Sequence, residues 1–136
     1  MDDLKDKWVI FDIDGVLCKK GTLLPIEAGV GIYQALAKTN PILFLTFRPE
    51  ETREETLTWL QQWVDKEIGN DQMLMRIPDT DITDYPPEEQ KVDILMGMFT
   101  GPEAILFAID DNPSIINAYK KAGICAVHFI APIIPD

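Results

Sequence analysis

The sequence is poor in cysteine, histidine and long apolar runs. Its two cysteines, Cys18 and Cys125, form no Cys-x-x-Cys pair and are too few for a disulfide framework. The only histidine, His128, lies in a short apolar run, and we expect it to be structural. No apolar run is long enough for a transmembrane helix, and the acidic start of the chain lacks the basic segment of a signal peptide. These absences predict a cytoplasmic protein with reduced thiols.

Basic residues are also scarce, with 12 Lys and Arg against 23 Asp and Glu and a formal net charge of −11 at pH 7. The acids concentrate in residues 50–71, with seven acids and two bases, and in residues 79–93, with six acids and one base. Proteins hold long nucleic acids mainly by neutralising phosphates with Lys and Arg. We therefore expect no stable binding of a long polyanion. Any reaction of a phosphate group would need a bound cation to offset its negative charge. The chain also lacks the G-x-x-x-x-G-K-[ST] motif of a kinase module.

The pattern of apolar residues predicts alternating strands and helices in a single domain covering residues 1–136. The predicted strands are residues 8–13, 42–47, 73–77, 104–109 and 125–130. The predicted helices are residues 26–38, a segment around Leu57, Leu60 and Val64 that ends at Gly69-Asn70, residues 88–99 and residues 113–122. Apolar strands separated by helices predict an α/β fold, a doubly wound parallel sheet covered on both faces. No insertion is long enough for a second, capping domain.

Two acids follow the first predicted strand. Asp12 and Asp14 close it in the sequence Asp-Ile-Asp-Gly, and residues two apart in an extended chain point to the same side. Gly15 then allows the chain to turn sharply. Both carboxylates are therefore expected to face one site.

Other polar residues follow the second and fourth strands. Thr46 and Arg48 end the second, Asp110 and Asp111 end the fourth, and Lys91 lies early in the helix before the fourth. Ligands of such sheets bind at the carboxyl ends of the strands. Crowded carboxylates need a counter-charge, and ligands that are all oxygen suit Mg²⁺. We expect a shared site for a divalent cation and an anion.

Each motif on its own has an ordinary structural explanation. Asp-x-Asp-Gly occurs in many turns, and a Thr-x-Arg pair can form a strand-edge salt bridge. Either Asp111 or Asn112 could cap the helix that begins at Pro113. Their joint position directly after apolar strands favours the shared site.

Taken together, these residues resemble the four motifs of the haloacid dehalogenase (HAD) superfamily of phosphohydrolases, and the resemblance covers nearly the whole chain. The matching residues are Asp12-Ile13-Asp14-Gly15-Val16, Thr46, Lys91 and Asp110-Asp111. The resemblance implies a five-stranded parallel core in the order 5-4-1-2-3 without a cap domain.

The resemblance also implies roles for these residues. Asp12 would be the nucleophile and form an aspartyl-phosphate, while Asp14 would protonate the leaving oxygen and then activate water. Thr46 would hydrogen-bond the phosphoryl group and Lys91 would neutralise it. The implied Mg²⁺ ligands are Asp12, Asp14 through its main-chain carbonyl, Asp110 and, directly or through water, Asp111.

A narrower resemblance follows the second strand. The residues Thr46-Phe47-Arg48-Pro49-Glu50, then Arg53, Thr56, Trp59 and Leu60, look like the phosphatase module of polynucleotide kinase-phosphatases. That module removes 3′-phosphates from nucleic-acid ends, and by resemblance Arg48 would contact the substrate. Phe47 stands where the relatives often have Gly, and its ring would narrow the site or stack on a base. Arg53 either orders the site or forms an ion pair along its own helix.

Two functions remain open. The first is a Mg²⁺-dependent phosphomonoesterase that acts on nucleotides or nucleic-acid 3′ ends. The second is a module without turnover that binds phosphate or accepts a phosphoryl group, as receiver domains do. Receiver domains carry paired acids after the first strand and the acceptor Asp after the third. Here an Asp-x-Asp follows the first strand and the paired acids follow the fourth, which favours the enzyme.

Overall fold

The computed structural model describes residues 2–131 and contains every predicted strand and helix. The strands are β1 (Trp8–Phe11), β2 (Ile42–Leu45), β3 (Met73–Leu74), β4 (Ile105–Asp110) and β5 (Ala126–His128). The helices are α1 (Glu27–Leu36), α2 (Arg53–Trp63), α3 (Pro87–Met98) and α4 (Pro113–Lys121). Four short 3₁₀ segments add Asp2–Asp6, Glu50–Thr52, Asn70–Gln72 and Pro102–Ala104. None of the helices within residues 2–131 combines the length and apolarity needed to cross a membrane.

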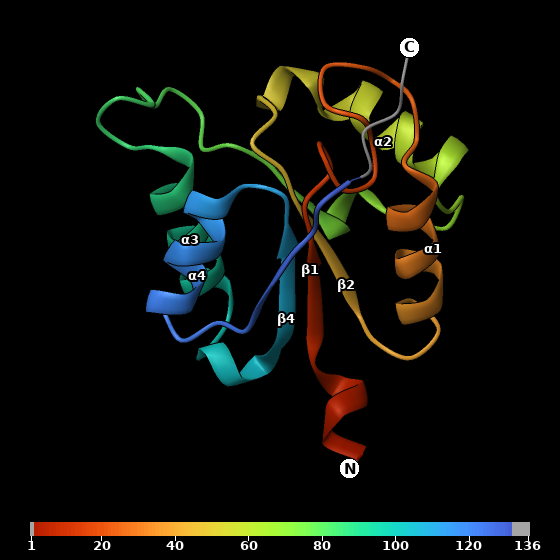
Figure 1. The fold of residues 1–136 in the computed structure, drawn as a ribbon. Coiled ribbons are helices and arrows are strands. Elements are labelled where there is room, and N and C mark those ends of the chain that lie inside the picture. Colours follow the sequence, from red (N-terminus) through yellow and green to blue (C-terminus); the bar gives the residue numbers. More distant parts are fainter. Residues whose placement is uncertain (1, 132–136) are drawn as a thin grey trace.

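The five strands form one parallel sheet in the order β3-β2-β1-β4-β5. This is the expected order 5-4-1-2-3 read from the opposite edge. In Figure 1, α3 and α4 lie on one side of the sheet, while α1 and α2 lie on the other. The α/β prediction is therefore confirmed. Because β1 lies between β2 and β4, the carboxyl ends of these three strands are neighbours.

Alternating side chains of β1 supply two separate cores. Val9 and Phe11 belong to one buried cluster, while Ile10 belongs to the other. In the first cluster Tyr33 of α1 stacks on Phe44 of β2, with ring centroids 5.5 Å apart. Burial of both sheet faces fixes the register of β1, and therefore the direction in which the residues after it point.

Two strands differ from the prediction. Strand β3 has only two residues, whereas residues 73–77 were expected. By Ile77 the chain has left the sheet, and the Ile77 amide donates to the Gln90 side chain. The expectation that every strand is covered on both faces is wrong for β5. Val127 is 41% exposed and His128 is also exposed, because β5 lies at the edge of the sheet.

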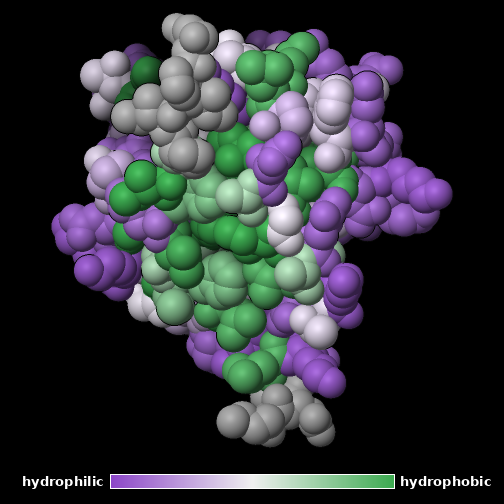
Figure 2. Space-filling model, turned by 45° about the vertical axis from the view of Figure 1, so that its right-hand side comes forward, coloured by the Kyte–Doolittle hydropathy of each residue, from purple (hydrophilic) through white to green (hydrophobic). Residues whose placement is uncertain are grey.

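Some large apolar side chains remain on the surface. Figure 2 shows one face on which hydrophobic residues gather at the centre and hydrophilic residues lie along the margin. The exposed apolar residues include Ile32 of α1, Val127 of β5 and Ile130. The core of the fold is thus closed around β1, β2 and β4 and more open towards β5.

Candidate functional site

Side chains from the carboxyl ends of β1, β2 and β4 line one cavity of about 260 Å³. The sequence-predicted site residues all line it except Thr46. The lining residues are Asp12, Asp14, Lys20, Phe47, Arg48, Pro87, Lys91, Asp110, Asp111, Asn112 and Ile115.

Three of these acids form a compact cluster. Asp12, Asp110 and Asp111 each offer a carboxylate oxygen, and these oxygens all lie within 4.8 Å of one another. Asp12 is 7% exposed and Asp110 is 1% exposed, so water screens little of the repulsion between their charges. The Asp14 side chain is not part of this cluster.

Lys91 of α3 is the cation nearest this cluster. Its Nζ donates to Asp110 Oδ2 at 2.7 Å and to Asp12 Oδ1 at 3.2 Å, and the residue is only 2% exposed. Burial alone would lower the pKa of Lys91, but the charges of Asp12 and Asp110 raise it above its ordinary value. Lys91 therefore stays protonated and offsets part of the acid cluster.

The single positive charge of Lys91 does not offset the negative charge of all three acids. Burial raises the pKa of Asp12 well above its ordinary value, and the charges of Asp110 and Asp111 raise it further, against the opposing effect of Lys91. Three oxygen donors with an excess of negative charge fit a hard divalent cation such as Mg²⁺. The donor set is therefore compatible with the expected metal.

A tight turn brings β1 close to Asp111. The amides of Leu17 and Cys18 both donate to the carbonyl of Ile13. Gly15 has a φ of +87°, and a Cβ there would lie 2.0 Å from Asp111 Oδ2. Only glycine fits both the left-handed backbone and this close approach.

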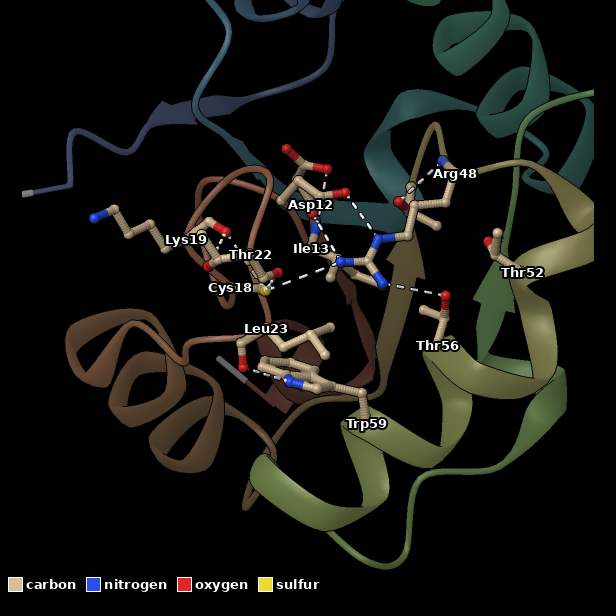
Figure 3. Close-up of polar contacts among 12 residues, drawn as sticks. Asp12, Ile13, Cys18, Lys19, Thr22, Leu23, Arg48, Thr52, Thr56 and Trp59 are labelled. Carbon is tan, nitrogen blue, oxygen red and sulfur yellow. Dashed lines mark hydrogen bonds and ion pairs between the residues drawn. The ribbon is translucent and has the colours of Figure 1, made fainter.

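Asp14 is held by Arg48. Arg48 Nε donates to Asp14 Oδ2 at 2.9 Å, and its Nη2 donates to Asp14 Oδ1 at 2.8 Å. Figure 3 shows this guanidinium between the turn after β1 and helix α2, where Nη1 donates to Thr56 Oγ1 at 3.2 Å. Arg48 was expected to contact substrate. It does line the cavity, but its paired donors face Asp14.

Thr46 and Phe47 lie at different depths. Thr46 is 1% exposed, and its Oγ1 accepts a hydrogen bond from the Arg48 amide at 3.2 Å. Phe47 lines the cavity, and the Arg76 guanidinium lies 4.9 Å from its ring centroid. One face of the ring is therefore already covered by a cation.

Several residues near the site were not placed there by sequence reasoning. Asn112 caps α4, because its side chain accepts from the Ser114 amide at 2.8 Å, yet it also lines the cavity. His128 Nε2 lies 3.1 Å from the carbonyl oxygen of Asp111. A helix-capping Asn directly after paired acids was the signal available for Asn112. The position of His128 depends on the pairing of β5 with β4, which no local pattern shows.

Arg53 lies outside the cavity lining. It pairs with Glu50, three residues earlier, at 2.8 Å, which is the helix-type ion pair considered from the sequence. Its Nη1 also donates to the carbonyl of Met73. Arg53 therefore links the start of α2 to β3.

No family model matches the chain, and a search of curated proteins found no match.

Proposed function

We propose that this protein is a Mg²⁺-dependent phosphomonoester hydrolase of the HAD type that works through an aspartyl-phosphate on Asp12. One observation carries the proposal. Asp12, Asp110 and Asp111 offer oxygens within 4.8 Å of one another, and Lys91 bridges two of them in the same cavity. Such an arrangement suits phosphoryl transfer, which depends on positioning and charge neutralisation.

The first step is attack by Asp12 on phosphorus. Asp12 Oδ1 accepts hydrogen bonds from the Ile13 amide at 2.9 Å and from Lys91, so Oδ2 is the freer oxygen for attack. The new Oδ2–P bond forms as the ester P–O bond breaks, and the leaving oxygen takes a proton from Asp14. The products are a free alcohol and an aspartyl-phosphate.

The second step regenerates the enzyme. Asp14 removes a proton from water, the water oxygen attacks phosphorus, and the bond to Asp12 breaks to release inorganic phosphate. Lys91 offsets negative charge on Asp12 throughout, and the Thr46 hydroxyl is the proposed donor to the phosphoryl group. A bound Mg²⁺, held by Asp12, Asp110, Asp111 and the Asp14 carbonyl, would supply the remaining positive charge.

We infer nucleotides or nucleic-acid 3′-phosphate ends as the substrate class. Lys20 and Phe47 line the cavity, and Lys19 and Lys20 line a neighbouring hollow of about 540 Å³. The net charge of −11 argues against a grip on a long polynucleotide, so a strand end or a free nucleotide fits better.

Activity with a generic aryl phosphate tests the proposal. We expect turnover with Mg²⁺, none in excess EDTA, and none in Asp12→Asn, which keeps the shape of the side chain but removes the nucleophile. Asp84→Asn is the matched control, because Asp84 is exposed and lies outside the cavity lining. Full activity of Asp12→Asn, or of the wild type in EDTA, would refute the assignment. A wild type without turnover would favour the phosphate-binding module instead.

A substrate panel tests the narrower inference. We would compare a 3′-phosphorylated oligonucleotide with 5′- and 3′-mononucleotides and with sugar phosphates, all in Mg²⁺. A higher kcat/KM for the oligonucleotide supports action at strand ends. An equal or lower value removes that role and leaves the phosphatase proposal intact.

A further inference from the structure

The Arg48 guanidinium is almost fully engaged by protein groups. Its Nε–Nη2 edge makes two parallel hydrogen bonds to Asp14, at 2.9 and 2.8 Å. Its Nη1 reaches Thr56 at 3.2 Å, and Nη2 also lies 3.9 Å from the Cys18 sulfur. Bidentate pairing of this kind gives geometric specificity as well as energy. The edge that would grip a phosphoryl group is therefore already occupied.

Two partners of Arg48, Thr56 and Cys18, are buried and come from separate elements. The Thr56 side chain belongs to α2 and the residue is 0% exposed, while Cys18 belongs to the turn after β1 and is also 0% exposed. The side chain of Arg48 itself is 18% exposed and that of Asp14 is 29% exposed. Asp14 lines the cavity, whereas Thr56, at the other end of the guanidinium, is anchored in the core. Figure 3 shows Arg48 reaching Thr56 of α2.

A second contact fixes α2 against the segment that follows this turn. Trp59, one turn after Thr56, is 6% exposed, and its Nε1 donates to the carbonyl of Leu23 at 2.9 Å. The helix that holds Arg48 is thus tied to the loop that carries Asp14. Both long-range contacts are distant in sequence, since Asp14 and Arg48 lie 34 residues apart and Leu23 and Trp59 lie 36 residues apart.

We propose that Arg48 is a positioning residue for Asp14, and that Thr56 in turn positions Arg48. This inference rests on the proposed function, in which Asp14 gives a proton to the leaving oxygen. The pair holds the Asp14 carboxylate at the mouth of the cavity and away from the Asp12, Asp110 and Asp111 cluster.

The leaving group distinguishes this role from direct binding of the phosphoryl group. An ester with a good leaving group, such as p-nitrophenyl phosphate, needs little help from an acid in the first step. An alkyl ester such as a nucleoside 3′-phosphate needs a proton on the departing oxygen. Loss of Asp14 positioning should therefore lower kcat/KM for the alkyl ester much more than for the aryl ester, whereas loss of a phosphoryl contact should lower both equally.

Thr56→Val is the main test, because it removes the hydroxyl and keeps the shape of a buried side chain. With Mg²⁺ we expect kcat/KM for the nucleoside 3′-phosphate to fall about tenfold and kcat/KM for p-nitrophenyl phosphate to fall less than about threefold. A tenfold loss is part of the roughly 10²–10⁴-fold that general acid catalysis contributes. Thr56→Ser restores the hydroxyl and should rescue the alkyl ester. Arg53→Lys is the matched control on the same helix, and it should leave the ratio of the two substrates unchanged.

Arg48→Lys tests the pair directly, since Lys cannot make two parallel bonds. We expect the same substrate dependence as in Thr56→Val, and no additive loss when the two are combined. Unfolding in urea without Mg²⁺ gives a readout independent of turnover. There, Arg48→Met and Asp14→Asn should be non-additive, because the two groups contact each other.

The outcomes separate the two proposals. Equal losses on both substrates in Thr56→Val and Arg48→Lys, in a wild type that turns over, would overturn the positioning role and leave the phosphatase proposal standing. Additive changes in the unfolding free energy of Arg48→Met and Asp14→Asn would also overturn the positioning role and leave the phosphatase proposal standing. A wild type without phosphatase activity would overturn the proposed function, and the positioning role with it.

Discussion

Replacing Lys91 with Met should remove the charge that makes the acid cluster tolerable. Met has a similar length and no charge, so the change leaves Asp12 and Asp110 buried beside each other, with no other cation of residues 2–131 paired with either. Lys91 is 2% exposed and lies 2.7 Å from Asp110 and 3.2 Å from Asp12, so solvent screens little of the interaction. Removing one partner of a buried ion pair costs about 3–5 kcal/mol.

That cost is a large part of the total stability of a small domain, which is about 5–15 kcal/mol. In a chain of this size, it corresponds to a fall in Tm on the order of 10–20 °C. Urea unfolding followed by tryptophan fluorescence at neutral pH in EDTA measures the difference. Lys120→Met, an exposed change on α4, is the control and should alter stability by less than about 0.5 kcal/mol.

The pH dependence gives the sign of the effect. Burial, with Asp110 and Asp111, already raises the pKa of Asp12 above 3.8, and Lys91 opposes this rise. Without Lys91 the pKa of Asp12 rises further. A carboxyl group with a raised pKa binds its proton more tightly in the folded state, so acidification from neutral pH towards 3.8 favours folding. The deficit of Lys91→Met should therefore shrink as the pH falls.

Added Mg²⁺ should also shrink the deficit, because a cation that binds only the folded state stabilises it. A loss below about 1 kcal/mol, or a deficit that grows on acidification, would refute the account of Lys91 as the compensating charge.

Three further changes test the scaffold of the site. Gly29→Ala should lower the stability of the fold by more than about 1 kcal/mol and shift the midpoint of urea unfolding down, because a Cβ there would lie 1.7 Å from the Val16 carbonyl oxygen. Unchanged stability would show that α1 can move away from the turn at no cost. Asn112→Ala removes the cap of α4 and should cost about 1 kcal/mol in thermal unfolding, whereas Asn112→Asp should retain most of it. Trp59→Phe loses the bond to the Leu23 carbonyl and should increase proteolysis within residues 19–24, and a cleavage rate equal to that of the wild type would contradict this.

Local pattern was enough to predict the order of strands and helices and to place the candidate site residues at the ends of strands. Residues 8–11 are apolar and include the β-branched Val9 and Ile10. The burial of this strand on both faces is what places Asp12 directly after a central strand. The same holds for Thr46 after β2 and for Asp110 at the end of β4. Because the strands of a parallel sheet end on the same side, the alternation of strands and helices was sufficient to predict that Asp12 and Asp110 meet. Thr46 is buried beside them and does not line their cavity.

Local pattern was less reliable for the two strands at the edges of the sheet, β3 and β5. The run at residues 125–130 reads as a buried strand, but β5 covers only Ala126–His128 and is partly exposed. Likewise, β3 stops after Leu74, and the amide of Ile77 donates to the Gln90 side chain of α3. A short apolar run does not reveal whether a second strand or helix covers it.

The pairing of charges was decided only by the tertiary structure. Lys91 lies 79 residues from Asp12, and its burial between Asp12 and Asp110 depends on how α3 packs beside β4. Arg48 was expected at the substrate, yet its guanidinium faces Asp14 and Thr56, because α2 folds back beside the turn after β1. The sequence was sufficient to identify the charged groups at the strand ends. The pairing of these charges depends on how the crossover helices pack, because packing brings together side chains that are far apart in the sequence and share no local pattern.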